Sequence, residues 1–252
     1  MRLFHISRIA MNELLYERVF YILLAFAVIG VVFGTALGQL SYGDQAKLSL
    51  DFMLAGIQIV MVLFSIFVGV GLFQKEMTSG SIAMVLSKPI ARSTFLLGKF
   101  IGQLVVQLTV IVALVGLTLL TRHIQEDLSF EFALAIGEAA FLIYLETIIL
   151  ASLAYFLATF CGGMTTAAVT LSFFFLGHFR KTIDLSTSSG WLWTVFEKVL
   201  PNLELFNFKT LASYGFNLPA HELLAIFCYA LVCSATFLIP AVLVFNERDI
   251  LT

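Results

Sequence analysis

Long apolar runs recur along this chain, and they constrain its fold more than any other feature. Six runs of 16 to 29 residues contain almost no charged side chains; they cover Val19–Leu40, Phe52–Phe73, Phe100–Leu120, Phe132–Phe160, Met164–Phe179 and Leu223–Phe245. About 20 apolar residues cross a bilayer as a helix, which satisfies its backbone hydrogen bonds internally. The runs therefore predict an all-α polytopic membrane protein with six transmembrane helices.

The composition excludes several other classes of protein. Only 12% of the residues are charged, about half the fraction of an average soluble domain. The net charge of −2 argues against nucleic acid as a partner, and membrane lipid is the expected surrounding. Cys161, Cys228 and Cys233 have neither metal-ligand spacing nor the even number of a disulfide framework. We expect no metal and no cofactor bound in this chain.

Residues Met1–Arg18 precede the first run and have the pattern of an amphipathic helix. Ile6, Ala10 and Leu14 share one side of that helix, whereas most of the charged side chains occupy the other side. Such a helix either lies in the membrane interface or packs on a partner, and the sequence favours the interface. The predicted organisation is this interfacial helix followed by a transmembrane domain over residues 19–252.

The charges of the loops predict which side of the membrane each loop faces. The segment Gln74–Lys99 has a net charge of +3 because four cations stand against Glu76, whereas loops 41–51 and 121–131 have net charges of −1 and −2. The positive-inside rule places Gln74–Lys99 in the cytoplasm and both acidic loops outside. With six spans, both termini are then cytoplasmic, and the long loop 180–222 is external.

The external loop also contains an apolar stretch. Residues 191–200 are too few to span a bilayer, and Pro201 follows them. We expect the stretch either to enter the outer leaflet and return, as a re-entrant segment, or to lie at the interface with its two tryptophans as anchors.

The cytoplasmic segment 74–99 has the features of a short helix. Residues 78–81 supply a helix start, and Ile82 and Val85 share an apolar face. Pro89 ends the helix, because the residue before a proline avoids helical backbone angles. The predicted shape is a helix parallel to the membrane, and the alternative is a solvated loop whose cations only fix the topology.

Several motifs stand in this segment and along the rest of the chain. The segment contains Glu76-x-x-x-Gly80, Leu86-Ser87-Lys88-Pro89-Ile90-x-Arg92 and Leu97-Gly98-Lys99. The remainder contains Gly38-Gln39-Leu40-Ser41, Leu200-Pro201-Asn202-Leu203-Glu204-x-Phe206-Asn207 and Phe245-x-x-Arg248-Asp249. In this order they resemble the ABC type-2 permeases, the membrane subunits of type-2 ABC exporters, over nearly the whole chain. The resemblance does not indicate a substrate.

The resemblance implies an architecture and a set of partners. Members of the family have six transmembrane helices, an N-terminal interfacial helix and small re-entrant helices before the last span. Two membrane subunits, identical or paralogous, bind two cytoplasmic ABC ATPase subunits, and the segment after span two is the coupling helix that contacts the ATPase. The residues that match this contact segment are Glu76, Gly80, Ile82, Val85, Pro89 and Arg92.

The chain itself has no nucleotide-binding motif. No G-x-x-x-x-G-K-[ST] sequence occurs in it, and Gly98-Lys99 is followed by Phe100. ATP and Mg²⁺ are therefore expected in the partner ATPase, and the chain is not expected to be an enzyme. The predicted function is an ABC transporter permease that forms the path for export across a plasma membrane, the inner membrane of a bacterium.

Two other functions remain as alternatives. The same ATPase-driven motion could signal across the membrane to a periplasmic or extracellular partner without transport. An intramembrane enzyme built on Glu138, Glu146 and His178 is disfavoured, because the chain lacks the paired motifs of such enzymes.

Some small and acidic residues inside the runs have two interpretations each. Gly30, Gly34 and Gly38 form two G-x-x-x-G units that let another helix approach closely, within the chain or across a dimer, and the resemblance favours the dimer. Glu146, near the middle of the fourth run, is either a proton or substrate site or an internally hydrogen-bonded group, and the second is favoured. Glu138 is a further candidate for a path or internal polar residue, and it is expected nearer the outer surface, at the interface.

The amide and histidine side chains are similarly ambiguous. Gln58, Gln103 and Gln107 either line a path or link helices, and linking is commoner. Three histidines fall on the predicted outer side, with no spacing that supports a metal site: His123, His178 and His221.

Overall fold

Helices make up the regular structure of the described chain. The computed structural model describes residues 2–40, 45–69, 71, 73–75, 91–125, 129–179 and 201–247, and all the elements within these ranges are helical. In chain order they are α1 (Arg2–Tyr16), α2 (Arg18–Leu40), α3 (Gln45–Leu63), the π-helix η1 (Phe64–Gly69), α6 (Arg92–Ile124), α7 (Phe130–Ala158), α8 (Gly163–His178), the 3-10 helix η2 (Leu203–Phe206), α10 (Lys209–Ser213) and α11 (Ala220–Glu247).

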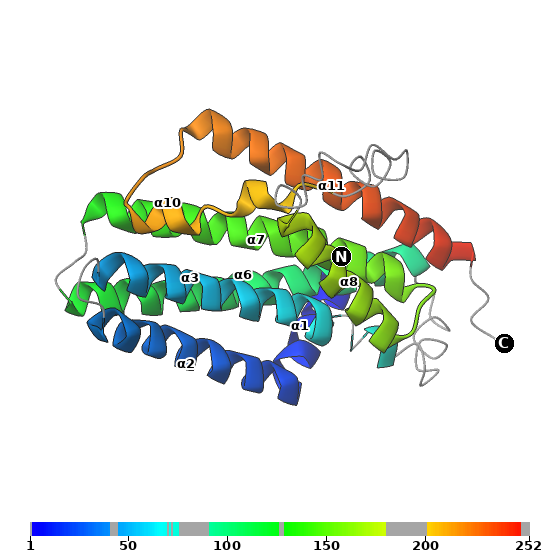
Figure 1. Ribbon diagram of the computed structural model, residues 1–252. Helices are drawn as coiled ribbons and strands as arrows, with labels where there is room; N and C mark the ends of the chain where they lie inside the picture. Colours follow the sequence, from blue (N-terminus) through cyan, green and yellow to red (C-terminus); the bar gives the residue numbers. More distant parts are fainter. Residues whose placement is uncertain are drawn as a thin grey trace.

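The long helices form a bundle with roughly parallel axes (Figure 1). α2, α3 with its continuation, α6, α7 and α11 run along its length, and these five are long and apolar enough to cross a membrane. α8 has 16 residues, so it is about 24 Å long and shorter than a hydrocarbon core of about 30 Å. It matches the fifth predicted run in length and position, and a sixth crossing stays a prediction.

The ends of the helices fall into two groups (Figure 1). The residues that flank segment 74–99 and the turn between α7 and α8 lie at one end of the bundle, which we call the segment end. The end of α2, the start of α3, the start of α7 and the connection from α10 to α11 lie at the opposite end, which we call the far end. The edges of segment 74–99 thus lie at the opposite end of the bundle from the starts of α3 and α7. Which side of a membrane each end faces stays a prediction.

The helix boundaries lie close to the predicted runs, except that the predicted starts of α3 and α6 were wrong; α3 begins at Gln45, seven residues before Phe52. The run Phe100–Leu120 predicted a shorter helix than Arg92–Ile124. The polar residues before Phe100 stay helical because α1 packs against this part of α6 and Lys99 pairs with Glu13 of α1. An apolar run marks only the part of a helix that suits lipid.

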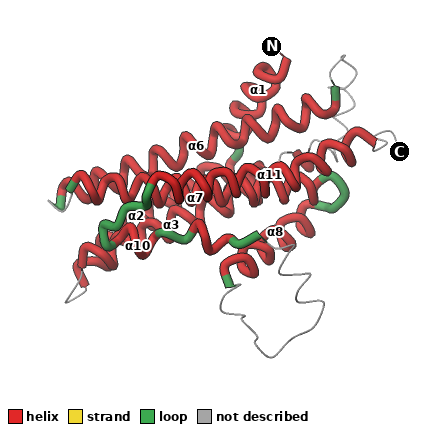
Figure 2. The backbone as a smooth tube through the Cα atoms, turned by 90° about the horizontal axis from the view of Figure 1, so that it is seen from above, coloured by secondary structure: helices red, strands yellow, loops and turns green. Residues whose placement is uncertain are grey.

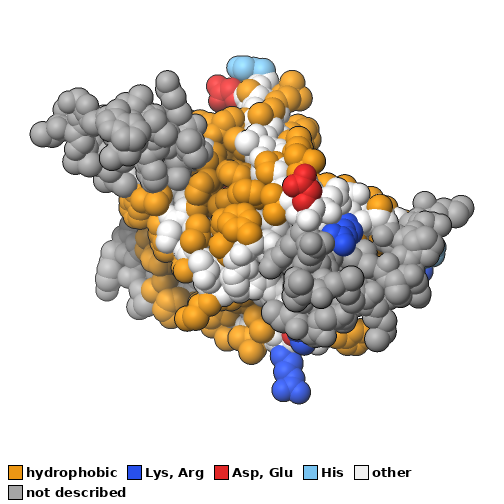
Figure 3. Space-filling view, turned by 90° about the vertical axis from the view of Figure 1, so that its right-hand side faces the viewer, with side chains coloured by type: hydrophobic (Ala, Val, Ile, Leu, Met, Phe, Trp, Pro, Cys, Tyr) orange, Lys and Arg blue, Asp and Glu red, His pale blue; other side chains and the backbone are white. Residues whose placement is uncertain are grey.

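The two most buried spans are α7 and the one formed by α3 and its continuation, whereas α2 and α11 expose most of their surface. Phe26 and Phe33 of α2 and Leu224 of α11 are among the exposed apolar side chains. Seen from the segment end, the described surface is mostly hydrophobic, with charged side chains at only a few places (Figure 3). Such a surface suits lipid or another apolar subunit.

The amphipathic helix α1 lies against α6 at the segment end (Figure 2). Ile6, Ala10 and Leu14 are buried, as the predicted apolar side requires, whereas Phe4 and Tyr16 are 68% and 83% exposed. Packing on α6 therefore accounts for one side of α1, and its place in the membrane interface stays a prediction.

Part of the predicted external loop folds into the bundle. The Oδ1 atom of Asn202 accepts a hydrogen bond from the backbone N–H of Glu204 (3.2 Å), which starts η2. Phe206 of η2 and Ala212 of α10 are fully buried in a cluster with α7. The apolar stretch 191–200 lies outside the described residues, so the predicted re-entrant segment there stays a prediction.

Candidate functional site

Arg92 belongs to the predicted ATPase contact set and lies in the described part of the chain. The other members of the set lie outside the described residues: Glu76, Gly80, Ile82, Val85 and Pro89. Arg92 begins α6, and its Nη1 donates a hydrogen bond to the backbone O of Asn246 near the end of α11 (3.2 Å). The start of α6 and the end of α11 are therefore joined where segment 74–99 returns to the bundle.

The first helix and the residue that follows it are joined to the two edges of segment 74–99. Lys75 Nζ lies 3.3 Å from Oε1 of Glu17, the residue between α1 and α2, and Lys99 pairs with Glu13 in the last turn of α1. The side chain of Lys75 is 73% exposed, whereas that of Lys99 is 6% exposed. Water and salt weaken exposed pairs, so the Lys99–Glu13 pair is the stronger connection.

Two glycines of α6 let α1 approach closely enough to form this pair. A Cβ on Gly98 would stand 2.6 Å from Cγ2 of Ile6, and a Cβ on Gly102 would stand 2.7 Å from the backbone O of Ser7. Gly98 and Gly102 are spaced as a G-x-x-x-G unit, the pattern that permits close helix packing. This G-x-x-x-G unit is the sequence signal for the packing of α1 on α6, and it was not predicted from the sequence.

Gln74 joins the same edge to the turn between α7 and α8. Its Nε2 donates to the backbone O of Cys161 (2.9 Å) and to Oγ1 of Thr166 (3.2 Å). Gly163 leaves room for this side chain, because a Cβ there would stand 2.6 Å from Gln74 Oε1. At the segment end, side-chain contacts therefore join the edges of segment 74–99 to α1, α8 and α11.

The predicted packing glycines of α2 differ from one another. A Cβ on Gly34 would stand 2.8 Å from Cγ of Met53, so Gly34 closes α2 onto α3 within the chain. Gly38 is buried, whereas no atom lies within 4 Å of a Cβ built on Gly30. Their predicted role in a dimer stays a prediction.

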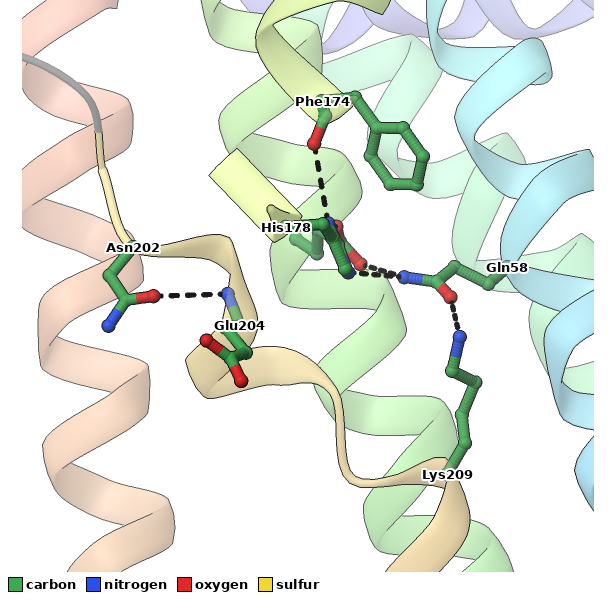
Figure 4. A network of polar contacts seen from close by, with 7 residues as sticks. Gln58, Phe174, His178, Asn202, Glu204 and Lys209 are labelled. Carbon is green, nitrogen blue, oxygen red and sulfur yellow. Dashed lines mark hydrogen bonds and ion pairs between the residues drawn. The ribbon is translucent and has the colours of Figure 1, made fainter. Parts of the chain in front are cut away.

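A buried polar cluster lies between α3, α7, α8 and α10; it consists of Gln58, Glu146, His178 and Lys209 (Figure 4). Gln58 is at its centre. The Nε2 atom of Gln58 donates to Oε2 of Glu146 (2.6 Å), and its Oε1 accepts from Nζ of Lys209. The second oxygen of Glu146, Oε1, lies 3.4 Å from His178 Nδ1 and has no hydrogen-bond partner among the described residues.

The cluster brings opposite charges together around one neutral amide. Glu146 is fully buried and Gln58 is 3% exposed, so an isolated charge at this place would be costly. Burial lowers the pKa of the Lys209 ammonium from its usual range, and the negative charges of Glu146 and Asp51 oppose that shift. Lys209 and Glu146 are therefore mutual counter-charges that Gln58 connects.

The cluster changes two expectations from the sequence. Glu146 has the internal hydrogen bond that was favoured for it, and the donor, Gln58, belongs to another helix, α3. His178 was expected on the outer side; it lies beside Glu146 because α8 ends near the middle of α7. No periodicity links Lys209 to Glu146, so the sequence carries no signal for this pair.

The remaining predicted polar residues lie outside the cluster. Oε2 of Glu138 accepts a hydrogen bond from the backbone N–H of Leu218 (2.8 Å), which attaches the connection before α11 to α7. Gln103 Nε2 donates to the backbone O of Ser65 (3.0 Å) and so links α6 to η1. Both polar side-chain atoms of Gln107 are buried without a hydrogen-bond partner in the described part of the chain.

Comparison with known families identifies the chain. A protein-family model described as "ABC-2 family transporter protein" matches residues 6–249. A comparison with curated proteins found no match. The matched range includes the six predicted runs, both edges of segment 74–99 and the buried polar cluster. The chain therefore belongs to the ABC-2 family of transporter membrane proteins.

Proposed function

We propose that this chain is the permease subunit of an ATP-driven exporter and that segment 74–99 couples it to a separate cytoplasmic ATPase. The observation that carries the proposal is the set of contacts at the two edges of that segment. Lys99 pairs with Glu13 of α1, Lys75 pairs with Glu17 between α1 and α2, and Arg92 bonds to the end of α11. A displacement of the segment would therefore move α1, α6 and α11 together.

The proposed assembly contains two permease chains and two cytoplasmic ABC ATPase subunits. ATP and Mg²⁺ are bound by the ATPases, and this chain supplies no bond-making chemistry. The second permease is a copy of this chain or a paralogue. The exposed apolar surfaces of α2 and α11 suit contact with such a subunit or with lipid. Export, a bacterial inner membrane and cytoplasmic termini belong to the same proposal.

The substrate path is proposed to use the polar residues of the bundle interior. Gln58, Glu146 and Gln107 are all buried polar side chains of three spans. Polar groups inside a membrane bundle usually face the interior and mark substrate or ion pathways. The cargo chemistry does not follow from them, because the cluster satisfies most of its own polar groups.

The alternative is an ATPase-driven signal to a periplasmic or extracellular partner without transport. Reconstitution of the chain with its ATPase in proteoliposomes separates the two functions. Export predicts a compound that raises ATP hydrolysis and accumulates across the membrane. An ATPase that responds only to a protein added on the outer side, with no compound accumulated, would replace export by signalling.

A further inference from the structure

We propose that the buried polar cluster is a proton-binding latch that holds α10 inside the bundle. The ligand is a proton taken up between Glu146 and His178. The part that responds is the short helix α10, which carries Lys209. This proposal concerns the chain alone, so it does not depend on coupling to an ATPase or on a cargo.

The latch depends on the orientation of the Gln58 amide. Its N–H group faces the Glu146 carboxylate. Its carbonyl oxygen faces the Lys209 ammonium (Figure 4). The amide dipole is thus aligned between a negative and a positive group, which strengthens both hydrogen bonds. In this arrangement the carboxylate and the ammonium cancel, and the cluster has no net charge.

The proton has a defined place in the cluster. Oε1 of Glu146 is buried without a hydrogen bond from the described residues; Nδ1 of His178 lies 3.4 Å from it and also 3.4 Å from the backbone O of Phe174. A proton between these two atoms would create the missing hydrogen bond. It would also leave the cluster with one excess positive charge, because the single negative charge of Glu146 cannot balance both the Lys209 ammonium and the added proton. An uncompensated buried charge is strongly unfavourable.

Other charged or titratable groups act on the cluster from the packed elements. Asp51 of α3 attracts Lys209, and Glu204 of η2 acts on His178. α11 contributes Tyr229, whose hydroxyl accepts a hydrogen bond from the backbone N–H of Asn202. These groups lie around the cluster, whereas the direct contacts to Lys209 and His178 come from Gln58, Glu146 and the backbone O of Phe174.

The α10 helix is the element that can relieve the excess charge. It has five residues, and Lys209 is its first. Its buried side is formed by Ala212 and Ser213, while Thr210 is exposed. Displacement of α10 carries the ammonium towards water, where a cation needs no counter-charge, at the cost of this small packed surface. Uptake of a proton therefore loosens α10, and loss of the proton restores it.

The test measures how fast a thiol on the buried side of α10 reacts with maleimide. The full-length chain is placed in lipid nanodiscs, which expose both membrane faces, with the three native cysteines replaced by serine. One sample carries Ser213→Cys, on the buried side, and a matched sample carries Thr210→Cys, on the exposed side of the same helix. The ratio of the two rates cancels the effect of pH on thiol chemistry.

The expected result is that the ratio of the Ser213→Cys rate to the Thr210→Cys rate rises about tenfold between about pH 8 and about pH 5. A histidine–carboxylate pair takes up a proton in this range. Glu146→Gln or Lys209→Met should abolish the rise. Glu138→Gln, which removes a carboxylate of the same helix outside the cluster, should retain it. An equal ratio at both pH values would overturn the proposal. So would a rise that persists in both cluster variants, or one that Glu138→Gln removes.

Discussion

The ammonium of Lys99 on α6, which is almost fully buried, pairs with the carboxylate of Glu13 on α1. Lys99 is the last residue of segment 74–99, and the first edge of that segment is joined through Lys75 to Glu17, the residue that follows α1. The two pairs differ in exposure, which makes their contributions separable by mutation.

Removal of the buried pair should loosen α1. Glu13→Gln is expected to lower the free energy of unfolding by about 1–3 kcal/mol, because a buried cation loses a charged hydrogen-bond acceptor. The measurement is thermal unfolding of the full-length chain in detergent, together with protease cleavage before Arg18. Glu17→Gln is the matched control and should cost less than about 1 kcal/mol, because its partner Lys75 is mostly exposed. Equal losses in both variants would contradict this ranking.

The surface of α6 on which α1 packs should not tolerate an added methyl group. Gly102→Ala places a Cβ 2.7 Å from the backbone O of Ser7, and backbone cannot move aside without displacing α1. We expect a loss of about 1–3 kcal/mol, typical of overpacking. Gly116→Ala, on the same helix with no atom within 4 Å of the new Cβ, should be neutral or stabilise by up to about 1 kcal/mol. Comparison of the two unfolding midpoints checks the prediction; a stable Gly102→Ala chain would refute the packing.

Gln58 should contribute to stability as the connection between two charges. Gln58→Leu removes the hydrogen bonds to Glu146 and Lys209 while keeping an apolar side chain of similar size. The expected cost is about 2–5 kcal/mol, because buried charged groups lose their partners. The midpoint of thermal unfolding and the yield of folded chain both measure it. An unchanged midpoint would show that the cluster adds no stability.

Gln107 should behave in the opposite way. Both of its polar atoms are buried without a hydrogen-bond partner among the described residues, so Gln107→Leu removes a desolvation cost and loses no hydrogen bond seen there. The expected change is neutral or stabilising by about 1–2 kcal/mol. A loss of stability as large as that of Gln58→Leu would mean that Gln107 has a partner outside the described residues, in lipid or in another subunit.

Much of the fold followed from hydropathy because lipid imposes a simple rule on sequence. The runs Val19–Leu40 and Phe132–Phe160 predicted α2 and α7 to within two residues at each end. The start of α6 was not predictable in this way, since Arg92 and Lys99 are polar. Their helix is held by tertiary contacts with Asn246 and Glu13, which no local pattern reports.

The candidate sites were predictable only in part. An acidic residue in the middle of an apolar run is conspicuous, because its charge is energetically costly inside a membrane. Glu146 was therefore a candidate from the sequence alone. Lys209 was not predictable in this way, because lysine is a common residue in loops. Only the fold shows that this loop enters the bundle. The G-x-x-x-G spacing of Gly98 and Gly102 is present in the sequence, as is the equivalent spacing in α2. In α2, Gly34 contacts α3 and Gly30 faces open space.

The most direct test of the account is the amount of ATPase that co-purifies with the full-length chain from its own cells, assayed as ATP hydrolysis. We predict that Glu76→Lys and Arg92→Glu insert normally but lose about tenfold or more of this activity, the effect of about 1.4 kcal/mol of lost binding. Lys47→Glu, a charge reversal at the far end beside Tyr214, should retain it. Full recovery of an active ATPase with both segment variants would contradict the coupling role of segment 74–99.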